Sequence, residues 1–326
     1  MRILYRGNHM PGHPAPYSTE AHIAFSLEAL GHEVVRIQEN EHSWLYTVTH
    51  SQDCDLFLWT QTKSYADMWP KQDALMALEL LGERMPTVGL HLDLFWGLQR
   101  EHLIHSEAWF RNQYLFTADG DHDADWLKAG VNHFWSPPGV YHAECEPGTM
   151  RQEYRGDVAF VGAHRGPYHS EHWNKRKEML NYLVRSYRSR FRLYPQREAI
   201  RGQDLNDLYA SVKVIVGDSC LAESSHKYWS DRATETIGRG GFLIMPWISG
   251  LAEMLKDQEH IVYFPPGDFT ELRRLIDYYL DHEGERERIR AAGQAHVRAN
   301  HSYLVRLLAM FKTLQREGAF TERVAV

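Results

Sequence analysis

The sequence predicts an α/β fold of two tandem Rossmann-like, doubly wound domains that face a cleft. In both halves, short apolar runs alternate with helical segments, which is typical of parallel sheets covered on both faces. A polar segment without periodicity, residues 142–156, separates the two series, and 326 residues exceed the usual size of one core. We therefore predict an N-terminal domain over 1–148, a C-terminal domain over 157–301, and a last helix over 302–326 that crosses back to the first domain.

The first series of strands fills the N-terminal half. The predicted strands are RILYRG, EVVRIQ, CDLFLWT, TVGLHLDL, YLFTAD and NHFWSPPGVY. Ser18 or Thr19 is expected to cap the first helix, because short hydroxyl side chains accept from backbone N–H groups there. Ile23 and Leu27 fall on one face of that helix, and Gly31 ends it.

The pattern restarts after the polar segment. The predicted strands are DVAFVGA, FRLYP, VKVIVG, FLIM and IVYFPPGD. Helices are expected over residues 173–186, 204–211, 270–281 and 284–300, and from Ser302 onward. A helix that follows a parallel strand begins at the carboxyl end of that strand, so its first turn points into the ligand crevice.

The stretch RATETIGRGGFLIMP, residues 232–246, joins such a helix to an apolar strand. A glycine pair explains the tight turn, but it does not explain Arg232 and Glu235 on the helix before it. A carboxylate accepts two hydroxyl hydrogen bonds and therefore suits a ribose, whereas arginine suits a diphosphate. An exposed Arg232–Glu235 pair, worth about 0.2–0.5 kcal/mol, explains the same spacing equally well.

The residues just before this helix add to the ligand hypothesis. Backbone N–H groups at a helix start can hold an anion, and Ser230 is expected to cap the helix. Lys227 and Tyr228 precede it. The helix start is therefore a candidate site for the diphosphate of a nucleotide.

Longer pieces of the C-terminal half resemble a known family. SDRATETIGRGGFLIMPWISGLAEML followed by HIVYFPPGDFTELRRLIDYYL resembles the donor domain of GT-B glycosyltransferases, closest to the spore-maturation-type branch of the glycosyltransferase group 1 superfamily. HSYLVRL, residues 301–307, resembles the H-T-Y-x-x-R that closes those domains. The resemblance covers about residues 157–310 and implies transfer of a hexose or pentose from a nucleotide-diphosphate sugar, such as a UDP-sugar, to an acceptor hydroxyl.

The resemblance also assigns individual residues. Glu235 matches the glutamate that binds the donor ribose, and Arg232 matches an arginine near the diphosphate. Retaining members of this fold often carry another glutamate eight positions earlier, where this chain has Lys227. That departure leaves open whether the reaction retains or inverts the anomeric configuration.

Two further loops are expected at the same sheet edge. Gly162, His164 and Arg165 follow the strand DVAFVGA, and the resemblance implies that this loop closes over the donor phosphates. A polar turn with a solvated Arg165 is the alternative. Asp218 and Ser219 end the strand VKVIVG, where they contact phosphate or sugar or cap a helix.

The first loop of the N-terminal half argues against a nicotinamide cofactor. GNHMPGHPAPY places Gly7 and Gly12 outside a G-x-G-x-x-G frame. The loop is also too long for a simple connection, which suggests that Gly7, Asn8, His9 and Gly12 contact the acceptor. Alternatively, its prolines only stiffen the chain.

GLHLDLFWG, residues 89–97, supplies the candidate base. His91 and Asp93 alternate with leucines, so they are expected to share one face of the strand end, where a carboxylate and an imidazole could deprotonate an acceptor hydroxyl. A hydrogen-bonded core histidine is the alternative. Trp96 either stacks on a sugar or base, or fills the core.

Composition excludes several classes of protein. The formal charge of −7 argues against wide contact with nucleic acid, and no apolar run approaches the roughly 20 residues of a membrane span. Three scattered cysteines (Cys54, Cys145 and Cys220), together with an N-terminus that lacks a signal-peptide pattern, predict a reduced, cytoplasmic protein. We found no metal-ligand motif, so no metal and no cofactor are expected beyond the nucleotide sugar as substrate.

The leading hypothesis is therefore a metal-independent GT-B glycosyltransferase. A glycan, a small metabolite and a hydroxymethylated base in DNA all fit as acceptor, although the net acidity of the chain disfavours DNA. The alternatives are a nucleotide-sugar epimerase of the same fold, an NAD enzyme without the usual fingerprint, and a catalytically silent sugar-nucleotide-binding protein.

Overall fold

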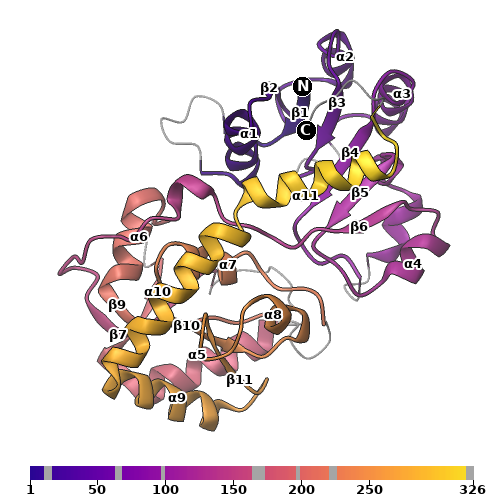
Figure 1. The fold of residues 1–326 in the computed structure, drawn as a ribbon. Coiled ribbons are helices and arrows are strands. Elements are labelled where there is room, and N and C mark those ends of the chain that lie inside the picture. Colours follow the sequence, from indigo (N-terminus) through magenta and orange to yellow (C-terminus); the bar gives the residue numbers. More distant parts are fainter. Residues whose placement is uncertain are drawn as a thin grey trace. The chain divides into compact units, whose positions relative to one another are not determined.

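The computed structural model describes residues 1–10, 17–62, 68–96, 100–163, 173–195, 199–219 and 226–320 (Figure 1). The chain divides into two units, each built on one parallel sheet. Unit 1 comprises Met1–Pro137 and Tyr303–Val326, and unit 2 comprises Pro138–Ser302. The last helix therefore belongs with the N-terminal part of the chain.

Unit 1 contains a six-stranded sheet in the order β2-β1-β3-β4-β5-β6. Its strands are β1 (Arg2–Gly7), β2 (Glu33–Gln38), β3 (Leu56–Trp59), β4 (Thr87–His91), β5 (Tyr114–Thr117) and β6 (His133–Trp135). Its helices are α1 (Thr19–Ala29), α2 (Trp44–Thr49), α3 (Lys71–Gly82), η2 (Glu101–His105), η3 (Ala108–Arg111), α4 (Asp123–Lys128) and α11 (Tyr303–Arg316). The strand order reverses between β1 and β3, which is the point where doubly wound folds bind ligands.

The predicted first helix is confirmed, together with its cap. The Ser18 hydroxyl accepts from the backbone N–H of Ala21 at 3.1 Å, and Gly31 takes a positive φ of 86° just past the end of α1. Helix α11 contacts α1 (Figure 1), and the ring of Phe311 in α11 lies 5.0 Å from that of His32, which follows α1.

Unit 2 contains a five-stranded sheet in the order β11-β10-β9-β7-β8. Its strands are β7 (Gly156–Val161), β8 (Phe191–Tyr194), β9 (Val212–Val216), β10 (Leu243–Pro246) and β11 (Val262–Phe264). Its helices are η4 (His142–Glu144), α5 (Trp173–Tyr187), η5 (Arg188–Arg190), α6 (Gly202–Ser211), α7 (Arg232–Gly238), α8 (Ser249–Met254), α9 (Phe269–Asp281) and α10 (Glu283–Asn300). Here the order reverses between β7 and β9, so the ends of these two strands mark the expected ligand edge.

The polar segment 142–156, which the sequence suggests as a linker, is part of unit 2. Arg151 pairs with Asp207 of α6 at 2.7 Å, and the backbone N–H of Thr149 donates to the same carboxylate at 2.8 Å. The Asn206 amide donates to two carbonyl oxygens of the segment. Hydrogen bonds and ion pairs attach this segment to unit 2, and hydrophobic periodicity does not reveal such contacts.

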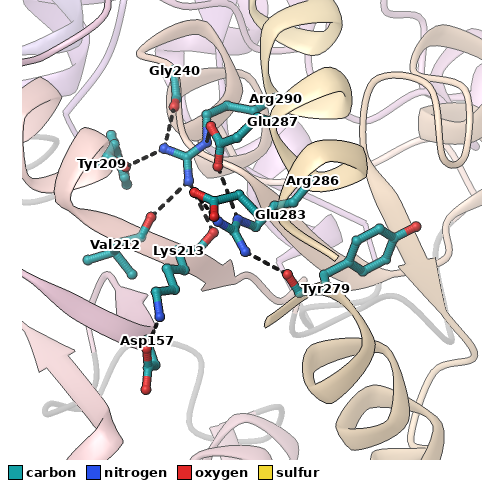
Figure 2. A network of polar contacts seen from close by, with 10 residues as sticks. All are labelled: Asp157, Tyr209, Val212, Lys213, Gly240, Tyr279, Glu283, Arg286, Glu287 and Arg290. Carbon is teal, nitrogen blue, oxygen red and sulfur yellow. Dashed lines mark hydrogen bonds and ion pairs between the residues drawn. The ribbon is translucent and has the colours of Figure 1, made fainter. Parts of the chain in front are cut away.

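Charged residues attach α10 to the amino edge of the unit 2 sheet, as Figure 2 shows. Arg290 donates to four backbone carbonyl oxygens, those of Tyr209, Val212, Lys213 and Gly240. Arg286 donates to the carbonyl oxygen of Tyr279 at 2.7 Å, and Glu287 lies 3.1 Å from each guanidinium. Because these side chains bind the protein itself, we assign the network a structural role.

Several features are absent from the described part of the chain. No helix there is both long and apolar enough to cross a membrane. No group of three or more His, Cys, Asp or Glu side chains in these ranges is arranged to hold a metal ion. Cys54 and Cys145 are free thiols, and burial raises the pKa of Cys145 to about 12.

Replacing Gly148 by alanine is expected to lower the free energy of unfolding by about 1–3 kcal/mol, because the new methyl group overpacks the contact with α6. The added Cβ would lie 2.1 Å from the carbonyl carbon of Asn206. Urea denaturation measures the effect. Gly284→Ala is the control, because its Cβ meets nothing within 4 Å in α10. Equal stability of the two variants would contradict this packing.

Candidate functional site

A cavity of about 320 Å³ opens at the carboxyl edge of the unit 2 sheet. It is lined by residues that follow β7 and β8 and by residues of α6 and α7: Val161, Gly162, Ala163, Tyr194, Pro195, Ala199, Ile200, Arg201, Leu205, Tyr209, Asp231, Arg232 and Glu235. The topology predicts a ligand site at this edge. Arg232 and Glu235, singled out from the sequence, both lie on its wall.

A buried carboxylate between two arginines organises this edge. Asp218, just past β9, accepts from Arg176 of α5 at 2.6 Å and from Arg232 of α7 at 3.3 Å. Arg176 also donates to the carbonyl oxygen of Ala163, and Arg232 to that of Val161, at 2.9 and 2.8 Å. The cluster therefore ties two helices to the ends of two strands, and its three side chains together carry a formal charge of +1.

Gly162 makes room for one of these arginines. A Cβ at this position would lie 2.4 Å from Nη2 of Arg232, and the backbone has a φ of 152° that side chains rarely adopt. The guanidinium also lies over the ring of Phe160, 5.3 Å from its centroid. Gly162 thus seats Arg232 against the backbone, an effect that the sequence analysis did not anticipate.

Glu235 lies one turn into α7 and is partly exposed to the cavity. Burial raises the pKa of this carboxyl to about 7; the charge of Asp231 also raises it, while Arg239 lowers it. The alternative of an Arg232–Glu235 ion pair is wrong, because Arg232 pairs with Asp218. Arg239, the other arginine of this stretch, is buried and pairs with Glu144 rather than with Glu235. The Glu235 carboxylate is thus not part of an ion pair within the described structure.

The start of α7 differs from the prediction. Asp231, not Ser230, occupies the N-cap position, and no side chain caps the helix. The Ser230 hydroxyl instead accepts from Arg232 at 3.4 Å. Lys227 packs against Gly250 and Tyr228 is buried; neither is among the described residues that line this cavity.

A second, smaller cavity of about 120 Å³ lies on the other side of the arginine cluster. Arg176, Asp218 and Ser219 line it together with residues that follow β10 and β11. Asp218, which the sequence offers as a ligand contact or a helix cap, pairs with both arginines, and the capping interpretation stays a prediction. Ser219 has a buried hydroxyl with no partner among the described residues. His164, Arg165 and Gly12 lie outside the described residues.

Sequence analysis missed Arg176 altogether. It belongs to WNKRK, at the start of α5, where basic residues are ordinary on a helix surface. In the structure its side chain is only 9% exposed and pairs with Asp218, 42 positions away. Two residues so far apart along the chain form no local pattern, so the sequence alone does not reveal that they pair.

In unit 1, the residues predicted on the acceptor side begin a loop that is anchored to β2. The Asn8 side chain accepts from Gln38 at 3.0 Å, and the backbone N–H of His9 donates to Gln38 at 2.7 Å. The His9 ring lies 3.1 Å from the carbonyl oxygen of Tyr5, and burial lowers the pKa of His9 to about 4. His9 is therefore neutral at physiological pH and holds the loop in place.

Glu20 is a carboxyl that the sequence analysis overlooked. It lies in the first turn of α1, where Gly7 leaves room for it; a Cβ on Gly7 would lie 3.1 Å from Cγ of Glu20. Burial raises the pKa of Glu20 to about 7, with smaller contributions from the charges of Glu39 and Asp93. Its signal in the sequence was an acidic residue two positions after the cap Ser18.

His91 and Asp93 do not share a strand face as predicted. Strand β4 ends at His91, and the chain leaves the sheet before Asp93, which is exposed. The His91 ring lies 5.6 Å from that of Trp109. Trp96 packs against Trp126 in the core of unit 1, so the core-filling interpretation is the better description of Trp96.

Comparison with known proteins bears on both units. A family model described as glycosyl transferase-like matches residues 148–312, about half of the chain. No curated protein sequence matches the chain.

Solved structures resemble the chain over nearly its whole length. HepE of Anabaena, in complex with UDP and glucose, is 13% identical with a TM-score of 0.62, covering 97% of this chain and 100% of that one. Sucrose-phosphate synthase of Thermosynechococcus elongatus is 12% identical with a TM-score of 0.61, covering 98% and 99%. An α-glucosyltransferase in complex with UDP-glucose and DNA containing an abasic site is 10% identical with a TM-score of 0.63, covering 97% and 99%. At these identities the likeness shows the fold, and it confirms the predicted GT-B class of two Rossmann-like domains.

Glu235→Gln is expected to gain stability relative to the wild type as the pH rises from 5 to 8, by about 1–3 kcal/mol. The folded-state pKa of about 7 lies above the unfolded value, so the wild type loses stability as the pH rises towards it. The glutamine has no proton to lose. Urea unfolding of both proteins across this range measures the difference. Parallel pH profiles would mean that Glu235 titrates normally in the folded protein.

Proposed function

This chain belongs to the glycosyl transferase-like family, and on that premise we propose that it transfers a sugar from a UDP-sugar to an acceptor hydroxyl. The observation that carries the proposal is the carboxylate of Glu235 beside the fixed guanidinium of Arg232 in one cavity. Structures of the same fold hold UDP and glucose in HepE and UDP-glucose in the α-glucosyltransferase, which supports the choice of donor. The transferred group is a hexose or a pentose.

In this proposal unit 2 binds the donor. The ionised Glu235 accepts hydrogen bonds from the ribose hydroxyls, and the net positive cluster around Arg232 attracts the diphosphate. His164 and Arg165 supply further positive charge or N–H donors, as the resemblance implies. Lys227, which the sequence also offers, does not line the cavity and departs from the family pattern. Fixed cations of this kind stabilise the departing diphosphate without a metal ion, because their positions require no rearrangement during the reaction.

Unit 1 is proposed to bind the acceptor, with Gly7, Asn8 and His9 on its loop. The sequence predicts Asp93 or His91 as the base of an inverting reaction, and this stays a prediction. The structure adds Glu20 to these candidates, because a carboxyl with a pKa near 7 is well matched to proton transfer at neutral pH.

Finer assignments follow from the motifs alone. The order of RATETIG, the FLIM strand and HSYLVRL supports membership of the spore-maturation-type branch. The scattered cysteines support a cytoplasmic location. A nucleotide-sugar epimerase of this fold and a non-catalytic sugar-nucleotide-binding protein are the competing functions, and product analysis separates them: transferred sugar, isomerised sugar or unchanged ligand.

Glu235→Ala is expected to lose the thermal stabilisation that UDP and UDP-glucose give the wild type. At a ligand concentration 100 times the Kd, that stabilisation is about 2.7 kcal/mol. A thermal-shift titration measures it. Glu253→Ala is the matched control, because Glu253 is exposed on α8 in the same unit. If both variants respond to UDP as the wild type does, Glu235 does not bind the ribose.

The base is identified by the pH dependence of transfer. If Glu20 takes the proton, Glu20→Gln is expected to slow transfer by about 10²–10⁴-fold. Asp93→Asn then keeps most of the activity and moves the acid limb of the profile to lower pH, because the Asp93 charge helps to raise the pKa of Glu20. The reverse pattern, with Asp93→Asn inactive and Glu20→Gln active, would give the role to Asp93. Rates of transfer from UDP-glucose between pH 5 and 9 decide.

A further inference from the structure

A cavity of about 250 Å³ lies wholly within unit 1. It opens at the carboxyl ends of β1 and β3, where the strand order reverses and where doubly wound domains bind ligands. Three tryptophans line it: Trp44, Trp59 and Trp69. A polar cavity with this many indole rings differs in kind from the arginine-rich edge of unit 2.

Arg6 lines this cavity, and one of its N–H groups lacks a hydrogen-bond partner among the described residues. It points from β1 into the protein and is only 1% exposed. Its Nη atoms donate to Thr47 at 2.9 Å and to two carbonyl oxygens, and its guanidinium lies 4.2 Å from the centre of the Trp44 ring. Its Nε is buried and has no hydrogen-bond partner within the described ranges.

The carboxylate of Glu39 lines the same cavity but does not form an ion pair with Arg6 in the described structure. Glu39, 4% exposed, accepts from the backbone N–H of Thr62 at 2.9 Å, and burial raises the pKa of its carboxyl. Nε1 of Trp59 is close enough to lower the pKa of Glu39, but no hydrogen bond of acceptable geometry joins the two. The wall of the cavity therefore contains two buried N–H groups, Nε of Arg6 and Nε1 of Trp59, that have no hydrogen-bond partner among the described residues, beside the Glu39 carboxylate.

Buried polar groups in this condition are costly unless a ligand or water completes their hydrogen bonds. A hydroxyl group both accepts and donates, so it can bridge an N–H of Arg6 or Trp59 to the Glu39 carboxylate. Trp44 and Trp59 belong to the hydrophobic core, whereas Trp69 is partly exposed, and its apolar ring face suits the C–H face of a pyranose ring. Arg6 and Glu39 together carry no net charge, so a neutral polar ligand is favoured over an anion, and a hydrocarbon would leave the polar groups unpaired.

We infer that this cavity binds one sugar ring of a saccharide acceptor, an inference that rests on the proposed glycosyl transfer. A DNA acceptor is disfavoured here, because duplex binding needs a track of positive charge for the phosphates. Lys71 and Glu107 also line the cavity, and their opposite charges cancel. The chain as a whole carries −7.

The test titrates the full chain with glucose, galactose, N-acetylglucosamine or maltose, each alone and without nucleotide. At least one is expected to shift the indole N–H resonance of Trp59 saturably. Trp69→Leu and Glu39→Gln should each weaken that binding at least about tenfold. Trp69 is partly exposed, so its replacement is compatible with folding. Trp247→Leu is the matched control, since Trp247 is 48% exposed on unit 2.

The inference is overturned if no saccharide perturbs Trp59, which would mean that only water fills the cavity. Equal losses in Trp69→Leu and Trp247→Leu would also overturn it. So would binding of a duplex containing 5-hydroxymethylcytosine that depends on Trp69 when no saccharide binds.

Two further outcomes separate this inference from the proposed function. Glu235→Ala should lose UDP and keep saccharide binding, because Glu235 lies in the other unit. Transfer to a saccharide with an unchanged KM in Trp69→Leu would refute the cavity assignment while the glycosyl transfer stands. Saccharide binding without any UDP binding or transfer would refute the function and leave a sugar-binding cavity.

Discussion

The carboxylate of Asp218 fixes the ligand edge of unit 2. It is 5% exposed and lies between Arg176 and Arg232, which come from two different helices. Loss of one partner from a buried charged cluster costs about 3–5 kcal/mol, because the remaining charge stays in a poorly solvating environment. The cluster therefore strongly resists rearrangement, and Gly162 has the backbone shape that allows it to form. Arg232 is in place before any ligand arrives.

Two charged clusters in unit 2 show how the same residue types serve different ends. At the amino edge, Arg290 and Arg286 donate hydrogen bonds to backbone carbonyl oxygens and pair with Glu287, and these contacts attach α10 to the sheet (Figure 2). At the carboxyl edge, two arginines share one aspartate and keep a net positive charge beside a cavity. Fixed positive charge in a partly desolvated site favours a ligand that carries negative charge. The strand direction, more than the number of arginines, separates the structural cluster from the candidate site.

The sequence predicted the fold well because hydrophobic periodicity and strand alternation are local properties. The apolar runs, the Ser18 cap and the restart of the pattern after 142–156 suffice for two parallel sheets. The same reasoning misplaced contacts that depend on distant residues. Ser230 resembles a cap, yet the start of α7 is held through Arg232 and Asp218. His91 and Asp93 alternate correctly for a strand, but the strand ends between them, and no residue type there marks that end.

Residues that break the local pattern were the better guides to chemistry. Glu235 follows an arginine on a helix that leads into a buried strand, and it lines a cavity. Arg6 carries a charge inside RILYRG, an otherwise apolar strand, and the sequence analysis passed over it as part of that strand. A buried charge costs folding free energy unless partners satisfy it, so such a residue has a specific reason to be there. In this chain both exceptions lie near the carboxyl ends of strands or on the helix that follows one, where the topology already predicts a ligand. A charged residue inside an apolar segment is stronger evidence for a ligand site when it also lies near the carboxyl end of a parallel strand, because the two observations are independent.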